Sequence, residues 1–202
     1  SLGNVITNEE LFDSYPVEAI RYYLISNTIL GQDFRFDPDN LINLYNNVLI
    51  KDFGNLFQRI SKIAKSIEEN LNKFFEESKD KINIVQTKSN DVIKTFLLNW
   101  NFFDYSAYLN ELITNLNKIL TETKPWTLDV YEQVISIGNI LIDFHSVMCL
   151  MLPIIPTKIL ELACYWGWEN KLNFLGNLEL KFKHVEKIIA FSKIEIKKVN
   201  EP

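Results

Sequence analysis

Apolar residues recur along most of the chain at the three- and four-residue spacing of an α-helix. Asp37-Pro38 is typical of a helix start, and the helical spacing then continues to about Phe75 with Gly54 inside it. Pro125-Trp126 interrupts the pattern, and Thr127-Leu128-Asp129 starts a strongly apolar helix that continues to about Leu152. Further helices are predicted from about Asp91 to Trp100, after Asp104 as a cap, and from Pro153 and Pro156 to about Tyr165.

The remaining segments predict short elements and connections. Asn8 is expected to cap a helix over Glu9 to Ser14, and Pro16 to open one from Val17 to about Asn27. A turn at Gly31 to Asp33 precedes Phe34 and Phe36, which are either a short strand or two anchors into a core. The polar stretch Ser78 to Asn90 is predicted to be a connection, and Leu180 to Val199 a short helix or an edge strand. The prediction is a mainly α protein: a small connecting unit at 1–36 and a helical bundle at 37–202.

Composition changes this picture little. The 47% hydrophobic content supports a packed fold, and the formal net charge of −5 argues against a protein that coats nucleic acid by bulk charge. The apolar run Val147 to Ile155 is too short to span a bilayer, so no membrane association is expected. Cys149 and Cys164 lie in apolar surroundings, which predicts two buried free thiols in a reducing compartment. Because the chain begins with Ser1 and not Met, we expect it to be part of a longer protein.

Residues that could carry catalysis are sparse. The two histidines, His145 and His184, are far apart, and His145 lies in an apolar helix where a hydrogen-bonded core histidine is expected. The sequence has no metal-ligand spacing around them, no CxxC motif and no glycine-rich phosphate loop. We therefore predict no catalytic site, no metal site and no bound cofactor in this chain.

A basic stripe on the long predicted helix points to binding. The apolar residues between Phe53 and Ile67 fall within an arc of about 120°, which predicts the core face. Asn55 and Arg59 lie one turn apart on the other side, and no acidic residue interrupts this stripe before Glu68. Asn and Arg can make paired hydrogen bonds to base edges, and lysines can contact phosphates. The stripe contains Lys51, Asn55, Gln58, Arg59, Lys62 and Lys65.

Trp126 is the second candidate binding residue. It follows Pro125 at a junction between two helices. Such a tryptophan either closes the end of the bundle or offers its ring to an unstacked base. Physical chemistry alone favours the core position. A base-stacking role requires Trp126 to project beside Asn55 and Arg59 with part of its ring exposed.

Several segments, taken in order, resemble a known family. Residues 1–6 resemble the end of the KMSKS loop of class I aminoacyl-tRNA synthetases, with Ser1 as its last serine. Residues 10–36 resemble the helix pair that follows this loop. Gly54-Asn55-Leu56-x-x-Arg59, Asn117-Lys118 and Lys124-Pro125-Trp126 are similar to the anticodon-binding domain of methionyl-tRNA synthetases, and Leu152 to Pro156 to a helix start near its end. The resemblance fades after Trp168 and departs from the family at Thr7-Asn8 and Pro16-Val17.

The resemblance implies a function that the residues alone do not establish. It implies anticodon contacts from Asn55, Arg59 and Trp126, with Trp126 stacked on the first anticodon base. Lys51, Lys62 and Pro125 are expected to support these contacts, the two lysines on account of the basic stripe. The parent enzyme would use ATP, with Mg, to attach methionine to a tRNA with the anticodon CAU, through a catalytic domain absent from this chain. DNA is not an expected partner, and the expected location is the cytoplasm, or alternatively the mitochondrial matrix or another organelle.

Two alternatives remain open from the sequence. The chain could be a non-catalytic helical module that binds tRNA or protein. It could also be the same region of a synthetase for cysteine, leucine or valine. Competition among anticodon stem-loops would separate the synthetases, and the residues that precede Ser1 would separate an enzyme from a module.

Overall fold

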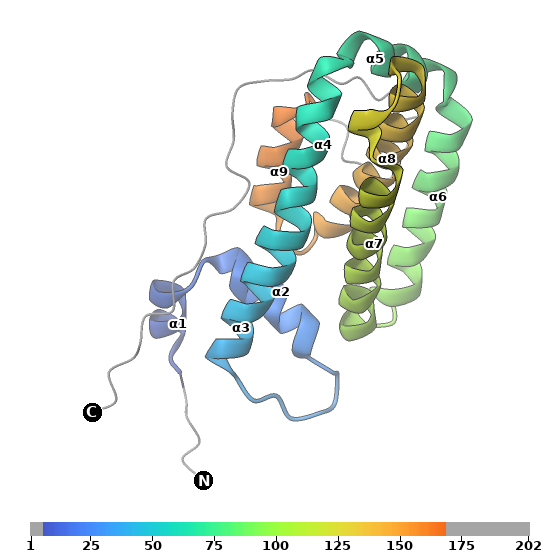
Figure 1. The fold of residues 1–202 in the computed structure, drawn as a ribbon. Helices are drawn as coiled ribbons and strands as arrows, with labels where there is room; N and C mark the ends of the chain where they lie inside the picture. The colour runs from blue at the N-terminus through green and yellow to red at the C-terminus, as the bar shows by residue number, and fades with distance from the viewer. Residues whose placement is uncertain (1–5, 169–202) are drawn as a thin grey trace.

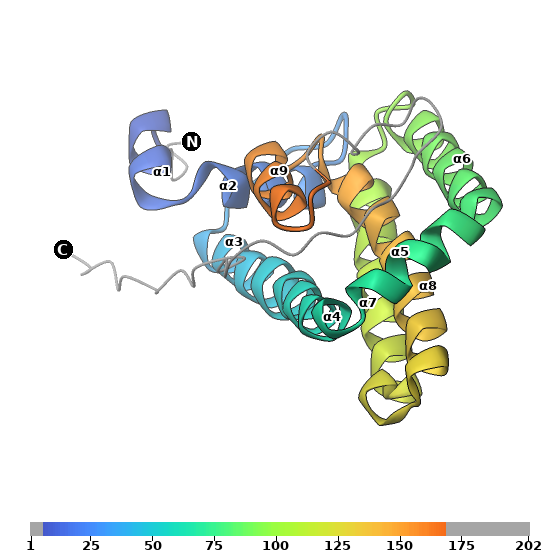
Figure 2. The same ribbon diagram turned by 90° about the horizontal axis from the view of Figure 1, so that it is seen from above.

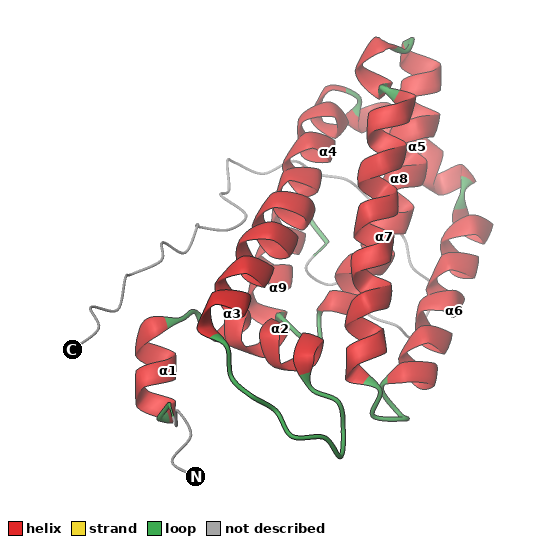
Figure 3. Ribbon diagram, turned by 60° about the horizontal axis from the view of Figure 1, so that its bottom comes forward, coloured by secondary structure: helices red, strands yellow, loops and turns green. Residues whose placement is uncertain are grey.

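The computed structural model describes residues 6–168, and helices account for most of this range. No strand occurs in the described part, which confirms the mainly α fold class (Figures 1 and 3). The elements are α1 (Asn8–Ser14), α2 (Val17–Asn27), α3 (Pro38–Leu44), η1 (Tyr45–Gly54), α4 (Asn55–Ser66), α5 (Glu68–Glu77), α6 (Lys79–Phe96), α7 (Phe102–Thr123), η2 (Pro125–Thr127), α8 (Val130–Met151) and α9 (Pro156–Tyr165).

Side-chain caps fix where several helices begin. Asp37 accepts hydrogen bonds from the backbone N–H groups of Asp39 and Asn40, as predicted for the start of α3. Asp129 caps α8 in the same way. Two predicted caps are wrong by a few residues. Thr7 and not Asn8 caps α1, since it forms a reciprocal capping box with Glu10. Asn101 and not Asp104 caps α7.

The long helix predicted from Pro38 to Phe75 is a chain of four segments. Between α3 and α4 the backbone widens into the π-helical segment η1, and Gly54 is buried at its end. At Ile67 the backbone leaves helical geometry, and α5 turns away from α4. The apolar spacing continues through both changes because Phe53, Leu71 and Phe75 all reach the core. Apolar periodicity therefore predicted burial correctly but not the break at Ile67.

The predicted connection Ser78 to Asn90 is wrong, because this stretch belongs to the helix α6. Polar residues dominate α6, but Ile82, Val85 and Ser89 line its side toward α8. The Ser89 hydroxyl makes a short hydrogen bond with that of Ser146, and Lys81 donates to the Asn139 side chain at 2.6 Å. Contacts with α8 thus stabilise a helix whose sequence looks like a solvated linker.

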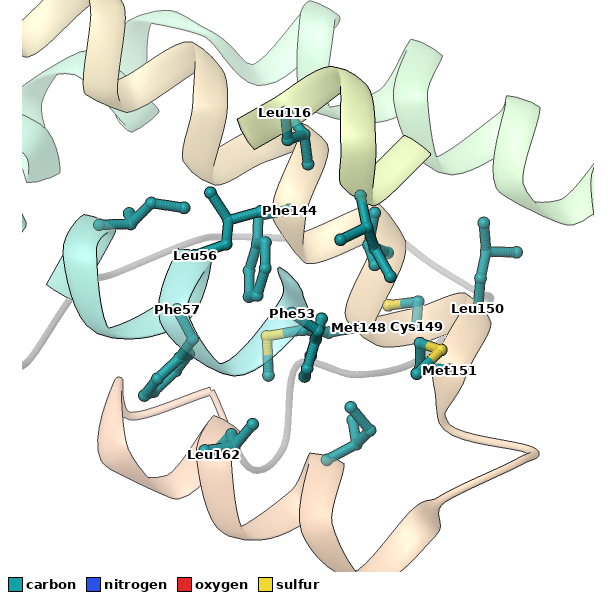
Figure 4. Packing of buried hydrophobic residues seen from close by; sticks show 14 of the residues in the cluster. Phe53, Leu56, Phe57, Leu116, Phe144, Met148, Cys149, Leu150, Met151 and Leu162 are labelled. Atoms are coloured by element: carbon teal, nitrogen blue, oxygen red, sulfur yellow. The ribbon is translucent and has the colours of Figure 1, made fainter. Parts of the chain in front are cut away.

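The apolar helix α8 lies at the centre of the bundle. The helices α7 and α6 pack along it, and α5 crosses it on the way from α4 to α6 (Figure 2). Phe144 stacks on Phe53 with ring centroids 5.1 Å apart, and Met148 and Met151 fill the space toward α9 (Figure 4). The helix α8 has the length and hydropathy of a membrane-spanning helix, but 72% of its most apolar window is buried inside the protein. Its central position accounts for this composition.

The helix α2 is anchored to the start of α9 and to the turn before it. Arg21 donates hydrogen bonds to the backbone oxygens of Pro153 and Ile154, at 2.8 and 2.6 Å. Glu18 accepts a 2.7 Å hydrogen bond from the backbone N–H of Lys158, in the first turn of α9. A carboxylate at that position accepts a hydrogen bond from an otherwise unpaired helix N–H group. Its negative charge is also attracted by the positive end of the helix dipole.

The residues between α2 and α3 contain no strand, so the two phenylalanines act as anchors. Phe36 packs edge-on against Tyr15 and Tyr23, and Phe34 against Tyr23. The Tyr23 hydroxyl accepts a hydrogen bond from the backbone N–H of Asp37. The turn at Gly31 is confirmed and needs glycine, since φ there is +83°. The division into units 1–36 and 37–202 stays a prediction.

Candidate nucleic-acid interface

Arg59 and Trp126 lie next to each other, although 66 positions separate them in the sequence. The guanidinium carbon of Arg59 is 5.9 Å from the centroid of the Trp126 ring, within the range of a cation–π contact. The Trp126 side chain remains 51% exposed. Trp126 is therefore partly exposed and lies beside Arg59, as two parts of the sequence-based condition for base stacking require.

The helix α4 presents the polar residues of this site. Its apolar residues Leu56, Phe57 and Ile60 are fully buried, which fixes the rotation of the helix about its axis. Asn55 is consequently exposed at the start of α4, and Arg59 is partly exposed one turn later. Buried Trp166 also donates a hydrogen bond from Nε1 to the Ser61 hydroxyl at 2.9 Å, which ties α4 to the end of α9.

The short helix η2 presents Trp126. Lys124 ends α7 with a left-handed backbone, φ 44° and ψ 56°, and its carbonyl oxygen accepts hydrogen bonds from both N–H and Oγ1 of Thr127. Pro125 is buried, and its carbonyl oxygen accepts a 2.8 Å hydrogen bond from the Gln133 side chain on α8. These contacts hold the turn from both helices and leave the indole of Trp126 projecting.

The helix α7 connects the two halves of the site. Asn117 donates from Nδ2 to the backbone oxygen of Asp52 at 3.0 Å, just before α4 begins. One turn later, the Thr121 hydroxyl accepts a hydrogen bond from Nη2 of Arg59 at 3.4 Å. Two polar contacts thus join α7 to η1 and α4, the second of them beside Trp126.

The remaining predicted site residues differ in where they lie relative to Arg59 and Trp126. Lys62 is exposed one turn after Arg59, on the same helix. Lys51 is also exposed, but it lies in η1, where the 100° projection of an α-helix does not hold. Ser1, the predicted last residue of a KMSKS-like loop, lies outside the described residues. The positively charged side chains near the site thus include Arg59, Lys62 and Lys65 of α4 and Lys124, two residues before Trp126.

The chemistry available here is binding. An exposed indole face can stack on an unpaired base, while the Asn55 amide and the Arg59 guanidinium can hydrogen-bond to base edges. Within residues 6–168, no group of three or more histidine, cysteine or acidic side chains is positioned to hold a metal ion. His145 is a core residue, as expected: it is buried, and its ring packs edge-on against Trp168.

Sequence reasoning missed the residues that hold the site together. Thr121 and Gln133 carried no signal as single positions, and the left-handed backbone of Lys124 was not predicted. The residue before a proline avoids helical geometry, so the end of α7 at Thr123 could have been expected from Pro125. The hydrogen bond between Thr121 and Arg59 could not have been expected from the sequence, because it depends on how α7 packs against α4.

Comparison with known proteins supports the sequence resemblance. A sequence family described as tRNA synthetases class I (M) matches residues 1–61. The methionine–tRNA ligase of Ureaplasma parvum is 26% identical over 165 residues, which are 80% of this chain and 32% of that protein. The methionine–tRNA ligase of Oceanobacillus iheyensis is 32% identical over 62% of this chain and 19% of that protein. The resemblance to methionyl-tRNA synthetases is confirmed.

Solved synthetase structures share the fold. The free methionyl-tRNA synthetase of Mycobacterium tuberculosis superposes with a TM-score of 0.71 at 13% identity, over 94% of this chain and 41% of that protein. The same enzyme in complex with methionyl-adenylate gives a TM-score of 0.64 at 15% identity. The chain spans about a third or less of the curated methionine–tRNA ligases named above, and it matches their C-terminal part.

Proposed function

We propose that this chain reads the anticodon of a tRNA, as part of a methionine–tRNA ligase that attaches methionine to its tRNA using ATP. The observation that carries the proposal is the pairing of Arg59 with the half-exposed ring of Trp126. The similarity to methionine–tRNA ligases supports the assignment. We place the ATP and methionine chemistry in other parts of the parent enzyme, since we assign no residue of this chain to it.

In this proposal, each side chain has a distinct role in binding an anticodon loop with the sequence CAU. Trp126 stacks on one unpaired base, and Asn55 and Arg59 hydrogen-bond to base edges and thereby select the sequence. Lys62 and Lys51 contact phosphates, which contributes to affinity but not to sequence selection. A loop has few phosphates to neutralise, so the net charge of −5 is compatible with this function.

The proposal predicts different effects for Arg59 and Lys62. Binding of a CAU stem-loop and of stem-loops with one altered anticodon base would be measured by fluorescence anisotropy at several salt concentrations. Arg59→Ala should relax discrimination by about 1–3 kcal/mol, because it removes paired hydrogen bonds to a base. Lys62→Ala should weaken all the stem-loops alike and lower the salt slope by about one.

Lys94→Ala serves as the matched control, because Lys94 is exposed on α6 and not on α4. It should leave both affinity and discrimination unchanged. A chain that binds all the stem-loops equally well would contradict the proposal. Preference for a cysteine, leucine or valine anticodon would assign the chain to another synthetase.

A further inference from the structure

We infer that Thr121 is a positioning residue of the anticodon site: its hydroxyl holds the Arg59 guanidinium beside the ring of Trp126 before any RNA binds. This inference rests on the proposed function, in which Arg59 selects the base. Arg59 has two described contacts, the Thr121 hydroxyl and the Trp126 ring. The hydrogen bond to Thr121 directs the charged end of the flexible Arg59 side chain toward the Trp126 ring.

The Thr121 hydroxyl accepts this hydrogen bond through a lone pair while it donates its own proton elsewhere. Its hydroxyl donates to the backbone oxygen of Asn117 at 2.8 Å, one turn earlier on α7. That bond fixes the rotation of the hydroxyl, and a lone pair is left for Nη2 of Arg59. The hydroxyl is also neutral, so Arg59 keeps its full charge and further N–H donors for a ligand.

Thr121 is itself held in place relative to α4. Asn117 connects α7 to the backbone of Asp52 at 3.0 Å, close to where α4 begins. The Arg59 contact at 3.4 Å is long for a hydrogen bond and lies at an exposed position. It therefore contributes little to the stability of the fold. Its effect should appear in the position of the guanidinium, and through it in binding.

The chain supplies a matched control at Thr123. The Thr123 hydroxyl donates to the backbone oxygen of Ile119 at 2.8 Å, just as the Thr121 hydroxyl does to Asn117. Its second partner is Ser136 on α8 and not an arginine. Substitution by valine therefore removes the same local hydrogen bond from α7 in both cases, but only Thr121→Val removes the contact with Arg59.

The first test needs no RNA. Protons held over the face of an indole are shifted upfield in NMR spectra, so the Arg59 side-chain Nε–Hε signal reports its distance from Trp126. Trp126→Ala should abolish the upfield shift, and Thr121→Val should reduce it. Thr121→Ser and Thr123→Val should retain it. An unchanged shift in Thr121→Val would overturn the inference, whatever the chain binds.

The second test measures binding of the CAU stem-loop and its single-base variants by anisotropy. Thr121→Val should lower affinity for CAU by about threefold to tenfold and relax discrimination, with rescue by Thr121→Ser and no effect of Thr123→Val. Full affinity and discrimination in Thr121→Val, with both lost in Arg59→Ala, would refute the positioning role alone. Unchanged binding in folded Arg59→Ala and Trp126→Ala would refute the proposed function itself.

Discussion

The backbone of Lys124 determines how Trp126 is presented. A left-handed conformation is unfavourable for a lysine by roughly 1–2 kcal/mol, and Lys124 adopts it where α7 ends. The Thr127 hydrogen bonds to Lys124 and the Gln133 hydrogen bond to Pro125 compensate for this cost. This left-handed backbone, held by hydrogen bonds within the turn and from α8, lies two residues before the exposed Trp126.

The two cysteines should differ sharply in reactivity. Cys149 is buried beside His145, and burial raises the pKa of its thiol to about 12. Cys164 is exposed, which corrects the prediction of two buried thiols. Because the thiolate is the reactive form, titration of the folded chain with a thiol reagent near pH 8 should modify one cysteine quickly.

Cys164→Ser should abolish that rapid reaction, and Cys149→Ser should leave it intact. Denaturation of the unsubstituted chain should expose the second thiol. Rapid modification of Cys149 in the folded protein would contradict the burial described here.

At the residue scale, the sequence correctly predicted helix starts and turns that depend on a few neighbouring residues. Asp37 as a cap, Pro38 and Pro156 in first helical turns and Gly31 in a turn were all correct, because each depends on nearby backbone geometry. Thr7 was missed in favour of its neighbour Asn8, since both residue types can cap a helix and only the reciprocal bond from Glu10 decides between them.

At the scale of elements, the site depends on the close approach of helices to α8. A Cβ atom added to Gly138 on α8 would come within 2.4 Å of the Phe74 ring on α5. No side chain fits at that distance without displacing the ring. The glycine thus allows α5 to cross α8 and so supports the placement of α4, from which α5 continues.

Gly138→Ala should therefore destabilise the fold by about 1–3 kcal/mol, because overpacking outweighs the gain in helix propensity. Chemical denaturation monitored by circular dichroism would measure the change. In a Phe74→Ala background the clash is absent, and the same substitution should be neutral or stabilising by up to about 1 kcal/mol. Destabilisation of equal size in both backgrounds would contradict the packing argument.

The elements that sequence analysis missed are those set by tertiary contacts. The part of α6 before Asp91 was interpreted as a connection because its exposed face is polar, whereas Ile82 and Ser89 face α8. The widening of η1 gave no signal, because Phe53 and Leu56 remain apolar in either geometry. The projection at 100° per residue correctly placed the polar residues of α4 on the side away from the core, because α4 is a regular α-helix. It does not describe Lys51, which lies in the π-helical segment η1.

At the scale of the whole molecule, the proposed binding site occupies one end of α7. Two exposed tryptophans lie near opposite ends of α7: Trp126, 51% exposed, after its C-terminus, and Trp100, 63% exposed, before its N-terminus. A helix of 22 residues is about 33 Å long, so one anticodon loop cannot contact both rings closely. Trp100 packs edge-on against Phe102 and has no described arginine contact. It is therefore the natural control for Trp126.

The central claim, that Trp126 binds an unpaired anticodon base, is tested most directly by comparing Trp126→Ala with Trp100→Ala. Affinity for the CAU stem-loop would be measured by anisotropy, with circular dichroism to establish that both variants are folded. Trp126→Ala should lose about 1–3 kcal/mol of binding free energy, and Trp100→Ala should bind like the unsubstituted chain. Full affinity in folded Trp126→Ala, or an equal loss in both variants, would contradict the account.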